Sequence, residues 1–258
     1  MIGWLRSLGR KRSPVDSAEA EKSVSWVLPF ETDLHSHLIP GIDDGVRETA
    51  QSLEILRQMK EIGYRRMIMT PHVMQDSYRN SSETIRRGLD GLRRAATEAG
   101  LPIELHAAAE YYMDGELLAR LERNDILSID SFLLFETSYY SAPLNLDEMV
   151  YEMSARGYRP LMAHPERYRY VRDREAFYGR MKELGVYFQV NINSLGGYYG
   201  EDAKHKAFWL AERGWIDALG SDLHGQRQLE FLRTTLEKGI LENVMKKNQI
   251  INDNLMKN

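Results

Sequence analysis

Histidine and carboxylate side chains recur along the chain in short motifs whose spacing suits metal binding. The motif Asp33-Leu34-His35-Ser36-His37 contains two histidines, and Ser221-Asp222-Leu223-His224 contains a second alternating pair. Residues i and i+2 of an extended segment share a face, so each pair can bind one metal ion. Six further candidates are His72, Glu110, Glu136, His164 and the adjacent Asp43 and Asp44, which lie between two glycines.

Composition narrows the chemistry. The sequence has no cysteine, which excludes disulfides, cysteine-type zinc sites, iron–sulfur clusters and thiol nucleophiles. Metal ions can therefore be held only by His, Asp and Glu. Lys and Arg number 34 against 38 Asp and Glu, and the net charge of −4 gives no electrostatic basis for binding nucleic acid. A hydrophobic content of 43% argues against global disorder.

The elements that must position these residues alternate between short apolar runs and amphipathic runs. The predicted strands are Thr32–Leu34, Arg66–Met69, Ile103–Ala109, Phe132–Phe135, Arg159–Ala163, Tyr187–Ile192 and Ile216–Leu219. The predicted helices are Thr49–Ile62, Ser82–Ala99, Asn145–Arg156, Asp173–Leu184 and Asp202–Arg213, each followed by a glycine, as is common at a helix C-terminus. This rhythm predicts an α/β fold with a parallel sheet. It does not distinguish a seven-stranded barrel from an eight-stranded one or from an open sheet.

The candidate ligands fall at the C-terminal ends of the predicted strands. In a parallel barrel these ends converge on one mouth, where active sites are found. Five of the seven histidines belong to this set, whereas His106 and His205 fall elsewhere and are expected to be structural.

The number of candidate ligands exceeds what one ion needs. A tetrahedral zinc ion takes about four ligands, and two-metal sites share carboxylates. The inventory therefore predicts two or three divalent ions. Three ions facing Asp43, Glu110, Glu136 and Asp222 would leave a net positive charge that suits a phosphate dianion, whereas two ions would leave the site about neutral.

The order HxH, PH, E, E, HPER and DxH resembles the polymerase-and-histidinol-phosphatase (PHP) superfamily. More narrowly, DLHSHLIPGIDDG with TPH, HPERY and SDLH is similar to the manganese-dependent bacterial protein-tyrosine phosphatases of capsule and exopolysaccharide synthesis. The resemblance covers about residues 30–230 and implies a distorted (β/α)7 TIM-like barrel of the PHP type.

The resemblance also implies a trinuclear metal centre, with manganese the expected metal and iron, cobalt or zinc the alternatives. The first ion would take His35, His37, Glu110 and Asp222, the second Glu110, Glu136 and His164, and the third Asp43, His72 and His224. Asp44 is the alternative to Asp43. Arg167 and Arg227 resemble the arginines that contact phosphate in the family, although SDLHGQRQL is shorter than the family's Arg-rich segment.

The activity implied is hydrolysis of phosphotyrosine by a metal-activated hydroxide, on a substrate such as the autophosphorylated tail of a bacterial tyrosine kinase. The general acid is not identified, and His224 qualifies only if it is not fully committed to a metal. Asn191 and Asn193 are candidates for orienting ligands or water. Tyrosines near the predicted mouth either bind the substrate ring or are ordinary rim aromatics; they are Tyr111, Tyr112, Tyr139, Tyr140, Tyr168, Tyr170, Tyr198 and Tyr199.

Three other functions stay open. The first is a small-molecule phosphatase of the same superfamily, acting on a compound such as histidinol phosphate. The second is a metal-dependent amidohydrolase, although that class has a lysine where this chain has Glu136. The third is a non-catalytic metal-binding adaptor, which a complete ligand set argues against.

The ends of the chain differ from its middle. Residues 1–25 are expected to be a basic and polar leader and 26–258 a single domain. Ile2, Trp4, Leu5 and Leu8 could instead touch an anionic membrane surface weakly. No apolar stretch reaches the roughly 18 residues of a membrane span. Without a signal-peptide pattern or cysteine, the expected location is the cytoplasm.

Overall fold

Strands and helices alternate along residues 28–256, the part of the chain that the computed structural model describes. The strands are β1 Thr32–Ser36, β2 Arg66–Met69, β3 His72–Val73, β4 Glu104–Ala107, β5 Glu110–Tyr112, β6 Phe132–Glu136, β7 Arg159–Ala163, β8 Tyr187–Asn191 and β9 Ala218–Gly220. The helices are α1 Thr49–Ile62, α2 Ser82–Glu98, α3 Gly115–Arg123, α4 Leu146–Ala155, α5 Arg174–Glu183, α6 Ile192–Gly196, α7 Glu201–Glu212, α8 Gln226–Glu237 and α9 Ile240–Lys247, with short 3-10 helices at Pro165–Arg167 and Asn252–Asn254.

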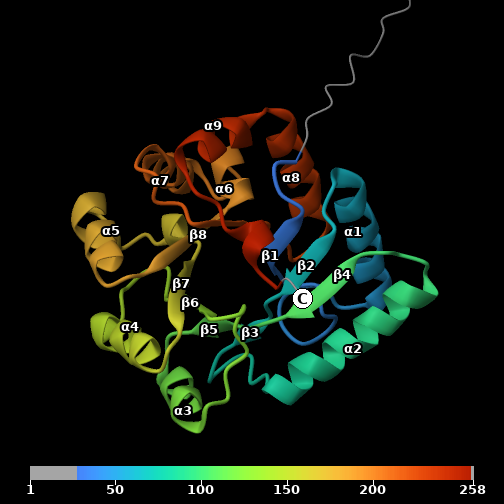
Figure 1. Ribbon diagram of the computed structural model, residues 1–258, viewed down its shortest axis with the longest axis horizontal. Helices are drawn as coiled ribbons and strands as arrows, with labels where there is room; N and C mark the ends of the chain where they lie inside the picture. Colours follow the sequence, from blue (N-terminus) through green and yellow to red (C-terminus); the bar gives the residue numbers. More distant parts are fainter. Residues whose placement is uncertain (1–27, 257–258) are drawn as a thin grey trace, which may run out of the picture.

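All neighbouring strands pair in parallel. One sheet has the order β1-β2-β4 and the other β3-β5-β6-β7-β8-β9. Only two residues separate β2 from β3 and β4 from β5, so the chain passes directly from one sheet to the other. After β9, Asp222 N donates to His35 O at 2.8 Å and His37 N donates to Leu223 O at 2.9 Å, which ties this end to β1. The strands surround a common centre with helices outside, as in a distorted TIM-like barrel (Figure 1).

The predicted α/β architecture is confirmed, and all five predicted helices are present within one residue of their expected ends. Three strand predictions need correction. The run 103–109 contains only β4, which ends at Ala107, and β5 begins after the run at Glu110. Ile192 begins α6 rather than ending β8, and β9 starts only at Ala218. Helices α3, α6, α8 and α9 were not predicted, although Asp114 caps α3 by accepting from Glu116 N and Leu117 N.

Alternation along the strands separates an inner from an outer hydrophobic layer. In β6, Phe132 and Leu134 join Leu34, Ile68 and other residues in an inner cluster, whereas Leu133 and Phe135 pack in the larger cluster that includes the helices. Since alternate residues share a face, Glu136 at the end of β6 has the same orientation as Phe132 and Leu134. The pattern that builds the core thus also aims Glu136 inward.

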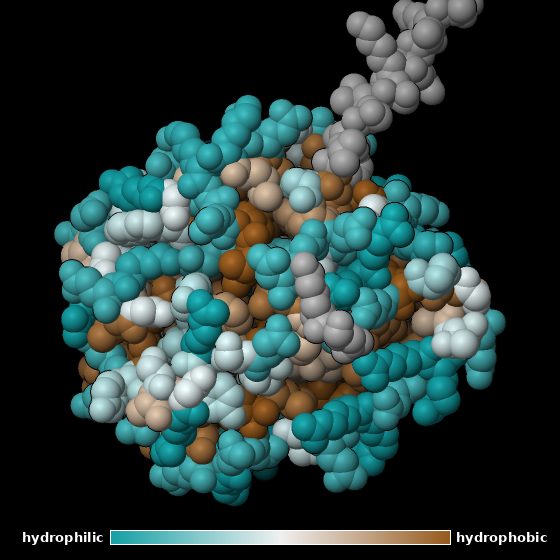
Figure 2. Space-filling view, viewed as in Figure 1, coloured by the Kyte–Doolittle hydropathy of each residue, from teal (hydrophilic) through white to brown (hydrophobic). Residues whose placement is uncertain are grey.

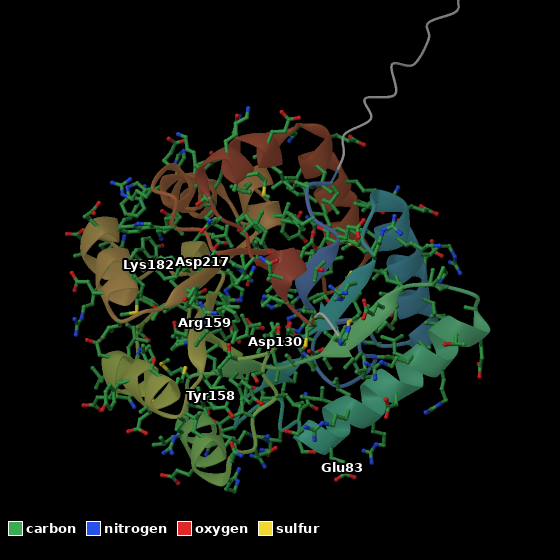
Figure 3. The ribbon with its side chains drawn as sticks, in the orientation of Figure 1. Glu83, Asp130, Tyr158, Arg159, Lys182 and Asp217 are labelled. Carbon is green, nitrogen blue, oxygen red and sulfur yellow. The ribbon has the colours of Figure 1, made fainter. Side chains whose placement is uncertain are left out.

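The C-terminal segment covers the end at which the strands begin. Asn252 Nδ2 donates to Thr32 O at 2.9 Å and to Leu219 O at 2.6 Å, so the segment that follows α9 lies against β1 and β9 (Figure 1). Arg159 begins β7, and Asp130 and Asp217 lie just before β6 and β9. Their side chains mark this end of the strands in Figure 3. Hydrophilic side chains surround this face and hydrophobic ones are visible between them (Figure 2). The candidate ligands lie at the other end of the strands.

Helices within residues 28–256 are all too short or too polar to cross a membrane. The leader predicted over 1–25 lies outside the described residues, and the assignment of 26–258 to one domain stays a prediction.

Candidate metal centre

Glu110, the first residue of β5, lies at the middle of the candidate site. Its carboxylate is fully buried, with Oε2 3.3 Å from His35 Nε2 and 3.4 Å from His37 Nε2. The same oxygen lies 3.0 Å from His72 Nδ1, and Oε1 lies 2.8 Å from His164 Nε2. One carboxylate thus faces four imidazoles, which is the arrangement of a ligand that bridges two ions.

The atoms that face one another are imidazole nitrogens and carboxylate oxygens, which are the usual ligand atoms of divalent cations. The Nε2 atoms of His35 and His37 point at each other across 3.2 Å. Glu110 Oε2 and His72 Nδ1 are close, but within the described residues neither makes a hydrogen bond of acceptable geometry. Buried polar atoms are normally hydrogen-bonded, so unsatisfied nitrogen and oxygen atoms converging on shared points fit divalent ions.

Four overlapping groups of side chains place their ligand atoms within 4.8 Å of one another. The groups are His37, Asp44, His72 and His224; His35, His37 and Asp222; His35, Glu110 and His164; and His72, Glu110 and Glu136. Members shared between groups link them into one centre with room for more than one ion. Eight of the nine ligands predicted from the sequence belong to it.

Asp43 is the predicted ligand that the structure does not bring into these groups. Its Oδ2 accepts hydrogen bonds from His37 Nδ1 at 2.8 Å and His72 N at 3.1 Å. The neighbouring Asp44 instead places Oδ1 3.4 Å from His72 Nε2 and 3.5 Å from His224 Nε2. Asp43 is therefore positioned to orient a histidine, and Asp44 to serve as the ligand.

Two glycines allow the backbone to approach the ligands closely. A Cβ atom on Gly45 would lie 2.1 Å from His37 O, and one on Gly220 would lie 2.7 Å from His35 Cβ. Gly45 N also donates to Asp43 Oδ1 at 3.0 Å. A side chain at either position would displace one of the paired histidines, His35 in β1 or His37 just after it.

A chain of side-chain hydrogen bonds supports the centre from β8. His35 Nδ1 donates to Gln189 Oε1 at 2.7 Å, which leaves Nε2 as the ring nitrogen that can bind a metal ion. Gln189 Nε2 donates to Asn191 Oδ1 at 2.9 Å, and Asn191 Nδ2 donates to Asp222 Oδ2 at 2.7 Å. Asn191 has the orienting position considered from the sequence, whereas Asn193 donates to Gln228 O instead. Gln189 was missed, although a polar pair on one face of a buried strand could have indicated it.

Two of the candidate ligands have left-handed backbone conformations. His164 has φ 32° and Asp222 has φ 52°. Such conformations cost about 1–3 kcal/mol in a non-glycine residue and cluster at functional sites. Here they occur just after β7 and β9, where the chain turns at the centre.

The imidazoles and carboxylates of the site shift one another's pKa values. Burial by itself would lower the pKa of both His37 and His72, but the facing carboxylates outweigh it. Asp43 and its neighbours raise the pKa of His37 well above its usual range, and Glu110 raises the pKa of His72 to about 10. Burial would raise the pKa of Asp222, yet His35 and other cations hold it well below its usual range. At neutral pH the metal-free centre therefore retains protons on His37 and His72.

Metal binding should consequently release protons, and the apparent metal affinity should fall as pH falls from about 8 to 6. Ions and protons compete for the same imidazole nitrogens, whose pKa values are raised in the folded protein. Calorimetric titration with Mn²⁺ in two buffers of different ionisation enthalpy measures the protons released. An affinity independent of pH, with no proton release, would contradict this electrostatic picture.

Arg167 is the one predicted phosphate-binding arginine that reaches the centre. Its Nη1 donates to Asp222 Oδ2 at 2.8 Å. Its guanidinium carbon lies 4.6 Å from the ring centroid of Tyr139 and 4.1 Å from that of Tyr199. Burial would lower the pKa of Arg167, but Asp222 raises it, so the cation persists at the edge of the cleft.

Arg227 lies elsewhere, 5.9 Å from the ring centroid of Tyr198 and in a separate hollow. Gln228 lines the metal cleft in its place and donates to Tyr199 OH at 3.2 Å. Successive side chains of an α-helix point in different directions. Because α8 begins at Gln226, only one of the two adjacent residues can face the centre.

A cleft of about 500 Å³ opens over the candidate ligands. Tyr112, Tyr139 and Tyr140 line it, together with Tyr78, whose ring stacks on His72 at 5.5 Å between centroids. The other predicted rim tyrosines are outside this lining, and Tyr111 is a buried residue. Tyr78 was missed because it lies in a loop with no motif around it.

Comparison with known proteins agrees with this geometry. A family model described as "Capsular polysaccharide synthesis, CpsB/CapC" matches residues 31–256. The tyrosine-protein phosphatase YwqE of Bacillus subtilis is 29% identical over 201 residues, which cover 77% of this chain and 79% of that protein. The tyrosine-protein phosphatase CpsB of Streptococcus pneumoniae is 25% identical over 199 residues, covering 74% and 82%.

The solved structures give the same relationship. Crystal structures of YwqE and CpsB, described as unique metal-dependent tyrosine phosphatases, include a match with a TM-score of 0.73 and 26% identity, covering 85% of this chain and 96% of that one. An amidohydrolase from Mycoplasma synoviae, at a TM-score of 0.52 and 11% identity, shares the fold. The chain belongs to the CpsB/CapC family of capsular polysaccharide synthesis.

Proposed function

We propose that this protein is a metal-dependent protein-tyrosine phosphatase. The observation that carries the proposal is the set of candidate ligands gathered around Glu110, here called the cage. It lies beside Arg167 in a cleft lined by tyrosines. Two to three divalent ions, with manganese the expected metal, would lower the pKa of water to about 7 and so supply the nucleophile. The geometry supports the following ligands: His35, His37, Asp44, His72, Glu110, Glu136, His164, Asp222 and His224.

The side chains around the cage suit a phosphate monoester. Arg167 would pair with the equatorial oxygens of the phosphoryl group, where charge builds up during transfer. Tyr78 and Tyr139 line the cleft and would pack on the ring of a phosphotyrosine. Tyrosinate leaves readily because the phenol has a pKa of about 10. His224 Nε2 faces Asp44, which supports a ligand role rather than that of the general acid.

The substrate is expected to be a phosphotyrosine protein. Relatives named tyrosine-protein phosphatases and the family's place in capsular polysaccharide synthesis support this class. The partner we expect is the autophosphorylated tail of a bacterial tyrosine kinase, acting in the cytoplasm.

The test is phosphate release from a phosphotyrosine peptide by the metal-free protein after addition of Mn²⁺, beside a His35→Ala variant. Metal-dependent release that the variant lacks would support the proposal. Histidinol phosphate and a small amide are offered in parallel. Faster hydrolysis of histidinol phosphate would favour a small-molecule phosphatase, amide cleavage an amidohydrolase, and metal binding without any turnover an adaptor.

Asp43 and Asp44 should respond differently to the same substitution. Asp44→Asn removes a candidate ligand and should lower the number of bound ions by one. Asp43→Asn removes the negative charge that faces His37 and one of the two acceptor oxygens, and should keep the ion count while weakening metal affinity by about 10–100-fold. Elemental analysis after equilibrium dialysis over a range of Mn²⁺ concentrations separates the two effects. The reverse pattern would restore Asp43 as the ligand.

A further inference from the structure

A second cleft, of about 630 Å³, adjoins the metal cleft. Tyr139, Tyr140 and Arg167 line both. The stack of Arg167 between Tyr139 and Tyr199 forms the boundary between the two clefts, so a polypeptide with one residue in the metal cleft can extend directly into the second one.

The charge of this second cleft is opposite to that of the whole chain. The protein has a net charge of −4, yet cationic side chains outnumber acidic ones in the lining. The cations are Arg167, Arg169, Arg172, Arg174 and Lys206, and the carboxylates are Glu201 and Asp202. Such a local reversal of charge favours an anionic ligand.

Several of these charges are already paired. Lys206 is buried and its Nζ donates to Tyr168 O at 2.8 Å and to Asp202 Oδ2 at 2.7 Å. Arg174 Nη2 lies 4.0 Å from Asp202 Oδ1, and Arg167 pairs with Asp222.

Arg169 and Arg172 are different. Both are exposed, and among residues 28–256 neither forms an ion pair. The guanidinium carbon of Arg169 lies 5.4 Å from the ring centroid of Tyr140, which lines both clefts. Two cations of the second cleft are therefore available to a ligand, and one of them, Arg169, lies beside a residue that lines both clefts.

The start of α7 adds backbone donors to the same cleft. Gly200, the N-cap residue of this 12-residue helix, has no side chain to accept from the first amides. Gly200 to Ala203 line the cleft. The amides of a first helical turn carry partial positive charge and bind anions, so they reinforce what Arg169 and Arg172 offer.

We propose that the second cleft binds an anionic side chain of the substrate next to the phosphotyrosine being hydrolysed, either a carboxylate or the phosphate of a second phosphotyrosine. The inference rests on the proposed function and refines its substrate class. The protein selects phosphotyrosine segments that carry a further negative charge, and Arg169 and Arg172 are the residues that recognise it.

The test compares kcat/KM for three peptides that differ at one position: a second phosphotyrosine, a glutamate or a glutamine. The position is moved along both sides of the hydrolysed residue. The metal-loaded protein should prefer an anionic neighbour at one position and side. The double variant R169Q/R172Q should lower kcat/KM for that peptide by about tenfold, mainly through KM. Comparison of the phosphate and carboxylate peptides identifies which anion the cleft prefers.

Three controls make the result specific. R86Q/R87Q changes the charge by the same amount on exposed positions of α2, away from both clefts, and should behave as the unmodified protein. R169K/R172K keeps the charge and should retain most of the preference. Hydrolysis of phenyl phosphate, which carries no second anion, should fall much less in R169Q/R172Q than hydrolysis of the anionic peptide.

Equal kcat/KM for all three peptides at every position would overturn the inference while leaving the proposed function intact. So would an R169Q/R172Q variant that keeps the full preference. Failure of the unmodified, metal-loaded protein to hydrolyse even free phosphotyrosine would overturn the proposed function and the inference with it.

Discussion

Replacing Glu110 with glutamine is expected to remove metal from the centre and to lower kcat for phosphotyrosine hydrolysis by about a thousandfold, or about 4 kcal/mol. The carboxylate faces His35, His37, His72 and His164 at once, at 2.8–3.4 Å. Glutamine keeps the size of the side chain but loses the charge and one of two acceptor oxygens, so it cannot bridge two ions.

Glu104→Gln is the matched control. Glu104 begins β4 on the same segment of chain, but it is exposed and pairs with Arg66 and His106 instead of the cage. Bound metal, kcat and the thermal unfolding temperature should be measured for both variants. A Glu110→Gln protein that retains its full metal content and activity would show that the cage is not the catalytic centre.

The second large effect is expected at Arg167. Arg167→Lys should lower kcat/KM by about a hundredfold, because one ammonium cannot reproduce two parallel hydrogen bonds to phosphate or stack between Tyr139 and Tyr199. The ligands of the cage remain in place, so the metal content should stay near that of the unmodified protein. Steady-state kinetics with a phosphotyrosine peptide, together with elemental analysis, test both statements.

Arg227 provides the comparison, since the family resemblance named it as a second candidate for phosphate contact although its segment is shorter than the family's. Its guanidinium lies by Tyr198 in a separate hollow, so Arg227→Gln should leave kcat/KM for free phosphotyrosine within about twofold. Equal losses in the Arg167 and Arg227 variants would mean that both arginines reach the phosphate and that the end of β9 is arranged differently.

Much of the fold follows from the sequence because its signals are local and repeated. Apolar stripes and terminal glycines predicted the five longer helices that lie between strands. The single strand expected over 103–109 failed because Ala108 and Ala109, both apolar and buried, give no sign that the chain changes sheet there. Helix α3 was accessible from its Asp114 cap, whereas five-residue α6 is too short for periodicity to show.

The site was predictable to the level of motifs and no further. Alternate residues of an extended segment share a face, so His35 with His37 could be recognised from spacing. Asp43 and Asp44 are chemically identical neighbours in a loop, and only the conformation that Gly45 permits decides which one faces Nε2 of the His72 ring and which one the His72 backbone. Arg227 and Gln228 are a second such case. They are adjacent in the first turn of α8, and spacing in the sequence does not tell which of the two faces the metal cleft.

The most direct test of the account is a titration of the metal-free protein with Mn²⁺, with bound ions and phosphate release from a phosphotyrosine peptide measured on the same samples. We predict that activity is absent without metal and rises with occupancy until two to three ions are bound per chain, which is the number that the overlapping ligand groups suggest. Full activity in the metal-free protein, or saturation of binding and activity at one ion per chain, would contradict it.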